Sequence, residues 1–296
     1  MIERILVPTD TSDFEGLALQ YALIFQKTLG AKLTLLYAQE FSLLLTGEHP
    51  IGYYLENVPE AKTKAVDELR KYAREHVPGD APVTTTVVDD TPARAIVATA
   101  ERIDADLIIM GTHGRTGLRR AFLGSVTERV LRETKRPVLT VRPPLLTADR
   151  EVNFRTILCP VNFTAVAHEA LDHACELARD FGASLVVMHV SELDETSDES
   201  IQTRFHDWVD PRVRERTRYQ RIIASGDPAA RILELADNTG VDLIVIGAQH
   251  KRFSDRTVIG ATTDRITRFA RQPVLTILRH PAVEPAREHE AEPIAV

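Results

Sequence analysis

The sequence contains a duplication, and this feature limits the possible folds more than any other. Residues 4–10 (RILVPTD) are echoed by residues 155–162 (RTILCPVN), so that Asp10 corresponds to Asn162, 152 positions later (162 − 10). Residues 106–111 (DLIIMG) match residues 242–247 (DLIVIG) at a spacing of 136 (247 − 111). Similarity at fixed spacings indicates a tandem repeat, and a chain of 296 residues has room for two ordinary domains.

Each copy alternates short apolar runs with longer amphipathic segments, which predicts parallel strands joined by helices. This pattern indicates an α/β protein made of two doubly wound, five-stranded parallel sheets, each covered by helices on both faces. Gly30 suits a helix end and Pro92 suits a first helical turn. In the first copy we expect strands near 2–8, 32–38, 83–88, 106–110 and 137–141, and helices near 13–29, 58–76, 92–103 and 122–135.

The second copy is expected to repeat this plan, with one less regular region. Its second helix falls in the polar stretch from about 197 to 216, which we expect to be irregular near Asp210 and Pro211. Strands are expected near 155–161, 184–190, 219–224, 242–246 and 273–278. We therefore predict a first domain at 1–142, a linker at 143–153, a second domain at 154–279 and a disordered tail at 280–296.

A glycine-rich loop follows the fourth expected strand of the first copy. Gly111, Gly114, Gly124 and Ser125 form the pattern G-x2-G-x9-G-S, which leads from the strand tip into a helix N-terminus. The free N–H groups and the dipole of a helix N-terminus suit a phosphate, and glycines let the backbone approach it closely. Asp10 follows the first expected strand. If these two strands are neighbours, Asp10 faces the loop across the crevice where such sheets bind ligands.

Each of these features alone is more simply explained as a cap or a turn, and their combination favours a nucleotide site. The sequence resembles tandem members of the universal stress protein family, whose ATP-binding members carry G-x2-G-x9-G-[ST] at this place. The resemblance covers both copies, apart from the linker and the tail, and the match to this motif is complete in the first copy. The resemblance implies strand order 3-2-1-4-5, an adenine nucleotide alpha hydrolase-like fold, and ATP as ligand, with an accompanying Mg²⁺ left open. It implies a nucleotide site made of Pro8, Thr9, Asp10, Ala38, Met110, Gly111, His113, Gly114, Arg115, Gly124, Ser125 and Val126.

The second copy departs from the motif at three positions. Asn162 replaces the aspartate, His250 replaces the second glycine and Ala261 replaces the serine. An amide still donates and accepts hydrogen bonds, but a histidine side chain obstructs the approach of backbone to an anion. Lys251, Arg252 and Arg256 suit a different anion or, more simply, a solvated basic loop. We expect the second copy to be a degenerate, mainly structural partner.

Several other readings of the chain are weaker. The net charge of −7 argues against nucleic acid as a partner, and no apolar run reaches the roughly 18 residues of a membrane helix. Cys159 and Cys175 are the two cysteines, too few for a disulfide framework, which favours the cytoplasm and a role as small core residues. The run H-E-x3-H places His168 and His173 five residues apart, unsuitable for one metal, and we expect both on the surface.

The leading hypothesis is an ATP-binding stress-response protein that acts by nucleotide-dependent regulation and is not an enzyme. The chain has no G-x4-G-K-[ST] motif, so a phosphoryl-transfer lysine of that type is absent from the sequence. Two alternatives remain open: a slow ATPase or a phosphoryl or nucleotidyl transferase, and a scaffold that binds no nucleotide. The resemblance implies that the last strands of the two copies pair as an internal pseudo-dimer, which leaves open a homodimer and an unidentified protein partner.

Overall fold

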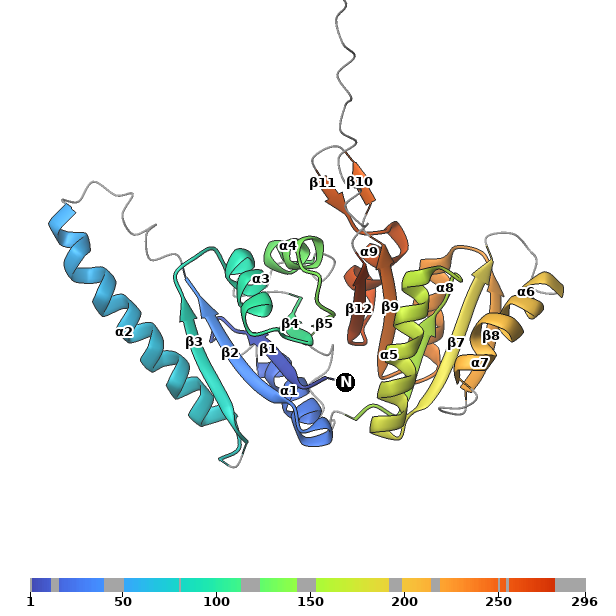
Figure 1. The fold of residues 1–296 in the computed structure, drawn as a ribbon, viewed down its shortest axis with the longest axis horizontal. Helices are drawn as coiled ribbons and strands as arrows, with labels where there is room; N and C mark the ends of the chain where they lie inside the picture. Colours follow the sequence, from blue (N-terminus) through green and yellow to red (C-terminus); the bar gives the residue numbers. More distant parts are fainter. Residues whose placement is uncertain are drawn as a thin grey trace, which may run out of the picture.

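Two units of alternating strands and helices follow one another along the chain in the computed structural model (Figure 1). The structure describes residues 2–11, 16–39, 51–79, 81–112, 123–142, 153–191, 199–213, 219–249, 251–253 and 256–279. The predicted linker, apart from Asn153, and the predicted tail lie outside the described residues.

The first unit has the predicted order of elements. Gly30 ends α1 with a φ of 72° and donates its N–H to the carbonyl of Gln26, and Pro92 opens α3, both as predicted. The predicted start of α2 near residue 58 is wrong, because the helix continues through Pro59 toward the N-terminus. The elements are β1 Arg4–Pro8, α1 Gly16–Leu29, β2 Lys32–Ala38, α2 Ile51–His76, β3 Val83–Val88, α3 Pro92–Arg102, β4 Leu107–Gly111, α4 Ser125–Glu133 and β5 Val138–Val141.

The second unit repeats this plan with two differences. The irregular region predicted near Asp210 is confirmed, since a π-helical turn, η3, lies between two short helices. A two-stranded hairpin, β10–β11, was not predicted. The elements are β6 Thr156–Pro160, α5 Ala165–Phe181, β7 Ser184–Ser191, α6 Glu199–Arg204, η3 Phe205–Val209, α7 Asp210–Val213, β8 Tyr219–Ser225, α8 Pro228–Asn238, β9 Leu243–Gln249, β10 Lys251–Phe253, β11 Arg256–Val258, α9 Ala261–Phe269 and β12 Val274–Arg279.

All the main strands join one ten-stranded sheet in the order β3-β2-β1-β4-β5-β12-β9-β6-β7-β8. The first half confirms the predicted order 3-2-1-4-5, and the second half has the same order for its own copy. At the centre β5 and β12 pair antiparallel, with Leu139 opposite Leu275. The predicted pairing of the two last strands within one chain is therefore confirmed, and each covers the edge of the other.

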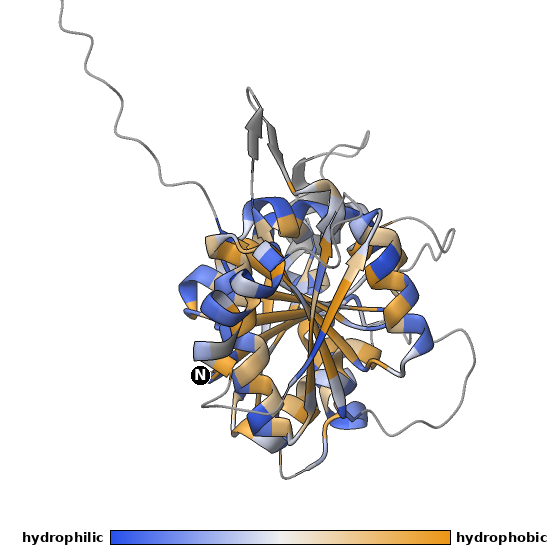
Figure 2. Cartoon of the chain, turned by 90° about the vertical axis from the view of Figure 1, so that its right-hand side faces the viewer, coloured by the Kyte–Doolittle hydropathy of each residue, from blue (hydrophilic) through white to orange (hydrophobic). Residues whose placement is uncertain are grey.

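The two units also share a core on one face of the sheet. Alternate residues of a strand point to opposite faces, so Ile5 and Val7 lie in the cluster shared by both units, whereas Leu6 lies in another. Helices α1, α2 and α5 cover the shared cluster, while α3, α4, α8 and α9 cover the other face. Figure 2 shows the apolar strands in the middle and the polar surfaces of the helices outside.

Four aromatic rings, from α1, α5 and the segment before β6, pack together between the two units. The ring centroids of Phe25 and Phe154 are 5.6 Å apart, those of Phe154 and Phe181 are 4.9 Å apart, and Tyr21 lies 5.7 Å from Phe154. Tyr21 and Phe25 belong to the first unit, whereas Phe154 and Phe181 belong to the second. Aromatic pairs at such distances contribute beyond the area that they bury, so this cluster binds the two units together.

Two predictions about single side chains have different outcomes. Cys159 and Cys175 are fully buried, as predicted for core residues, and burial raises the pKa of the Cys159 thiol. The surface position predicted for the two histidines is wrong, because both are partly buried. His168 stacks on Trp208 with ring centroids 4.1 Å apart, and burial lowers the pKa of His173. None of the described helices has the length and apolar character needed to cross a bilayer.

Candidate functional site

The carboxyl ends of β1 and β4 lie next to each other at one end of the sheet. We call this end, where the strands of the first unit finish, the edge of the first unit. Ile5 pairs with Leu107 and Leu6 pairs with Ile108 in parallel register. The two strands run in the same direction, so their last residues, Pro8 and Gly111, lie toward the same end of the sheet. The adjacency that the sequence argument required is therefore present, and Asp10 follows at the same edge. In a doubly wound sheet this is the edge at which ligands bind.

The backbone turns sharply directly after Asp10. Thr11 has a φ of 60°, and its N–H donates to Thr9 Oγ1 at 2.9 Å. A non-glycine residue in this left-handed region costs about 1–2 kcal/mol, and such residues often mark functional positions. Thr9 is buried and donates its N–H to the carbonyl of Leu36 at 2.8 Å, which anchors the turn to β2. This turn, which the sequence pattern did not reveal, fixes the backbone at Asp10.

The N-terminus of α4 opens at the same edge of the first unit. Gly124 is the N-cap residue, and no side chain among the described residues caps this end. Gly124 donates its N–H to the carbonyl of Thr112 at 2.8 Å, which ties the helix start to the residue after β4. The first N–H groups of a helix have no partner within it, so those that follow Gly124 are suited to an anion.

Thr127 is a structural position beside the candidate site that the sequence analysis missed. Its Oγ1 donates to the carbonyl of Gly111 at 2.8 Å, and the residue is buried, so it joins the first turn of α4 to the tip of β4. In the second copy, Thr263 Oγ1 makes the corresponding bond to the carbonyl of Gly247 at 3.1 Å. The two threonines are 136 positions apart (263 − 127), so the repeat itself held the signal.

The structure brings most of the predicted site residues to one edge of the first unit. Ala38 ends β2, the neighbour of β1 on the other side. Three predicted residues, His113, Gly114 and Arg115, lie outside the described residues, and their placement stays a prediction. The predicted residues at the edge are Pro8, Thr9, Asp10, Ala38, Met110, Gly111, Gly124, Ser125 and Val126.

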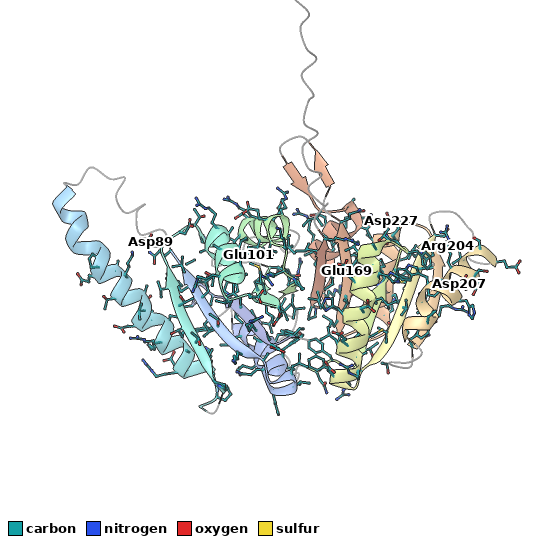
Figure 3. All side chains as sticks on the ribbon, viewed as in Figure 1. Asp89, Glu101, Glu169, Arg204, Asp207 and Asp227 are labelled. Atoms are coloured by element: carbon teal, nitrogen blue, oxygen red, sulfur yellow. The ribbon has the colours of Figure 1, made fainter. Side chains whose placement is uncertain are left out.

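The corresponding edge of the second copy is built differently. Asn162 accepts a hydrogen bond from Thr164 Oγ1 at 2.7 Å, so its amide oxygen already has a partner. Phe163 repeats the left-handed turn with a φ of 59°. Its ring lies 4.7 Å from the ring of His189 and 5.4 Å from that of Trp208. The guanidinium of Arg204, labelled in Figure 3 on the outer side of this unit, lies 5.8 Å from the Phe163 ring centroid.

The glycine loop of the first copy also has a different counterpart in the second. His250, the residue that replaces the second glycine, lies outside the described residues. After it the chain forms β10 and β11, with Lys251 paired to Val258 and Phe253 paired to Arg256. An antiparallel hairpin pairs about half of its backbone N–H groups with its own carbonyls, so these groups are not offered to an anion. Across the described residues, no group of three or more His, Cys, Asp or Glu side chains is arranged to hold a metal ion.

The family model of the universal stress proteins matches residues 1–142 and 153–277. The chain belongs to the universal stress protein family and carries two tandem copies of its domain. Universal stress protein MJ0531 of Methanocaldococcus jannaschii is 35% identical to it over 146 residues, which are 49% of this chain and 84% of that protein. Universal stress protein MJ0577 of the same organism is 33% identical over 157 residues, which are 48% of this chain and 96% of that protein.

A solved structure covers both copies at once. The crystal structure of a universal stress protein from Archaeoglobus fulgidus matches 93% of this chain and 98% of its own, with a TM-score of 0.70 and 23% sequence identity. This likeness shows that the fold of the whole tandem chain occurs in another protein.

Proposed function

We propose that this protein binds one ATP molecule in its first domain and acts as a nucleotide-dependent regulator in a stress response. The observation that carries the proposal is the pairing of β1 with β4, because it places Asp10 and the start of α4 at one edge of the sheet. The family match supports the reading, since the chain is a universal stress protein in both copies.

The residues at this edge fit the two ends of ATP. The N–H groups at the start of α4, after Gly124, suit phosphate oxygens, as does the dipole of that helix. The carboxylate of Asp10 suits the amino group of adenine or a ribose hydroxyl, since it accepts hydrogen bonds. Ala38 and Met110 would line the base, and a Mg²⁺ ion would accompany the nucleotide through phosphate oxygens. In this proposal nucleotide occupancy changes stability or partner choice, without rapid chemistry.

The number of bound nucleotides tests the proposal most directly. Mass spectrometry of the purified chain under native conditions, with ATP added, should find one adenine nucleotide per chain. Two nucleotides per chain would contradict a single site in the first domain. If none were bound, the chain would instead be a scaffold. Steady hydrolysis of ATP, abolished together with binding by a change in the loop, would identify an enzyme.

One change in each copy, at two different positions of the motif, locates the site. We expect Gly114→His, which copies the second loop into the first, to weaken ATP binding at least about 100-fold, because an obstructed loop loses several phosphate hydrogen bonds of about 1 kcal/mol each. Asn162→Ala in the second copy, at the position that corresponds to Asp10, is the control and should leave ATP affinity unchanged. Calorimetric titration measures both, and equal effects of the two changes would contradict a site in the first domain.

A further inference from the structure

The last turn of α9, which belongs to the second domain, lies against the proposed nucleotide edge of the first. Gly111 pairs with Val141 across β4 and β5, so Arg142 follows β5 at that edge. The guanidinium of Arg142 donates to the carbonyl of Thr267 at 3.3 Å and to the carbonyl of Arg268. A cation at the last carbonyls of a helix is favourable, and here it fixes the end of α9 in place.

The side chain of Arg268 reaches from this turn to α4 of the first domain. Its Nη2 lies 3.3 Å from Glu128 Oε2, and its Nε donates to Asp264 Oδ2 at 2.8 Å. Glu128 forms a second ion pair with Arg132 on its own helix. The side chains of Arg268 and Glu128 are 21% and 26% exposed, so water screens this pair less than it screens a fully exposed one.

Glu128 lies one helical turn beyond the N-terminus that we assign to the phosphates. Its N–H donates to the carbonyl of Gly124 at 2.9 Å, and residues four apart lie on the same face of a helix. A carboxylate at this distance from bound phosphate oxygens repels them unless a cation neutralises it. Glu128 pairs with Arg132 of its own helix and with Arg268 of the other domain, so positive charge from the second domain lies near the helix start that we propose for the phosphates.

Among the described residues, the Arg268–Glu128 pair and the Arg142 contact have no counterparts at the edge of the second unit. By the spacing of 136, Arg132 corresponds to Arg268 and Asp264 corresponds to Glu128. Among the residues that the structure describes, Arg132 pairs with Glu128 and forms no ion pair with Asp264. Leu278, buried in an apolar cluster, stands where the first copy has Arg142. Among the described residues, the contacts of Arg142 and Arg268 between the domains therefore lie at the edge of the first unit. This is the unit whose sequence has the complete glycine motif.

We infer that Arg268 of the second domain is a positioning residue for the phosphates bound by the first domain. It acts by neutralising Glu128, together with Arg132, in the first turn of α4. The inference rests on the proposed function and gives the second domain a part in nucleotide binding. Because the effect is electrostatic, it grows with the charge of the ligand, so Arg268 favours ATP over AMP.

The test compares Arg268→Gln with Arg265→Gln, on the same helix. Arg265 pairs with Asp227 at 2.6 Å within the second domain and is the matched control. Calorimetric titration of the full chain with ATP, ADP and AMP should show about tenfold weaker ATP binding for Arg268→Gln, a smaller loss for ADP, and AMP affinity within about twofold. The double variant Glu128→Gln/Arg268→Gln should recover ATP affinity, since the repelling carboxylate is gone.

Each result of this test has one meaning. If the unchanged chain binds no nucleotide, the proposed function fails. If it binds ATP and Arg268→Gln binds all three ligands as before, the role of Arg268 is overturned while the site stands. An equal loss for ATP and AMP would show a structural effect and overturn the electrostatic one. Failure of the double variant to recover, with its melting temperature retained, would overturn the route through Glu128.

Discussion

The two copies carry loops of the same length but of different composition. Gly111 and Gly124 frame the loop of the first copy, and Gly247 and Gly260 frame that of the second, both at a spacing of 136. Between these ends the first loop has glycine at 114 and 117, where the second has His250 and Phe253. Aromatic and β-branched residues favour strands, and the second loop forms the hairpin β10–β11. The hairpin therefore forms in the copy that lacks these two glycines.

The scaffold around the loops differs much less. Both copies keep a glycine N-cap at the following helix, a threonine that ties this helix to the strand tip, and a left-handed turn after the first strand. Backbone geometry has thus been retained in both copies, whereas the side chains at the proposed nucleotide site differ. The frame around the site is the same with either set of side chains.

The largest expected effect comes from breaking the contact between the two copies. Phe154→Ala should lower the free energy of unfolding by about 3–5 kcal/mol, because a buried phenylalanine in contact with three other rings is replaced by a cavity. Trp208, the one tryptophan of the chain, reports on the second copy by fluorescence, while circular dichroism reports on both. In urea the two signals should coincide for the unchanged chain and separate for the variant.

Phe205→Ala is the control for this experiment. Phe205 is also fully buried, but it packs against Phe163 within the second copy. Its loss should move the two signals together, because the aromatic cluster between the copies remains. Coincident transitions in Phe154→Ala would contradict the view that this cluster couples them.

The pH dependence of stability should distinguish two equivalent positions. Tyr21 in α1 corresponds to His173 in α5 at the spacing of 152 (173 − 21). Burial, with the charge of Asp242, raises the pKa of Tyr21 to about 12. The unfolded chain loses this proton above about pH 10, so stability should fall between pH 10 and 12 by on the order of 2 kcal/mol. Tyr21→Phe should remove this loss in urea unfolding, and an unchanged alkaline profile would contradict it.

His173 should affect the stability of the folded chain at the acid end of the pH range. Burial lowers its pKa from 6.5, so the unfolded chain binds this proton first as the pH falls. The contribution of the neutral ring is present above about pH 6.5 and is lost below it. His173→Gln should therefore flatten the acid side of the profile and leave the alkaline side as it is.

The smallest expected effect on stability comes from removing the threonine hydrogen bond that joins helix to strand in each copy. Thr127→Val and Thr263→Val should each cost about 1 kcal/mol, since each removes one hydrogen bond from a buried hydroxyl. Thermal unfolding should show similar losses. In ATP titrations Thr127→Val alone should weaken binding, because it loosens the start of α4 in the first copy. Weaker ATP binding in Thr263→Val as well would contradict the difference between the copies.

The regular parts of the fold were predictable because their signals are local. Buried parallel strands appear as short apolar runs, and the predicted bounds of β2 and β3 are those observed. The start of α2 was missed because Pro59 suits a first helical turn, although the helix continues through it. The π-helical turn places Trp208 on the ring of His168, a contact between segments far apart in sequence that local periodicity cannot encode.

The candidate site was predictable in part for similar reasons. Asp10 and the glycine loop carry chemistry in their residue types, so the sequence alone identified them. Thr127 was overlooked, although its counterpart Thr263 repeats at the same spacing. The pair Arg268–Glu128 depends on how the two domains dock. No pattern within either copy contains that information.

The antiparallel pairing of β5 with β12 changes how this protein responds to dilution. Two separate chains joined through their last strands would come apart at low concentration. Here both strands belong to one polypeptide, so each meets its partner at an effective concentration on the order of millimolar, whatever the amount of protein. Each half is therefore matched with the other half in preference to a second copy of itself. Such a permanent pair allows one half to specialise while the other supports it.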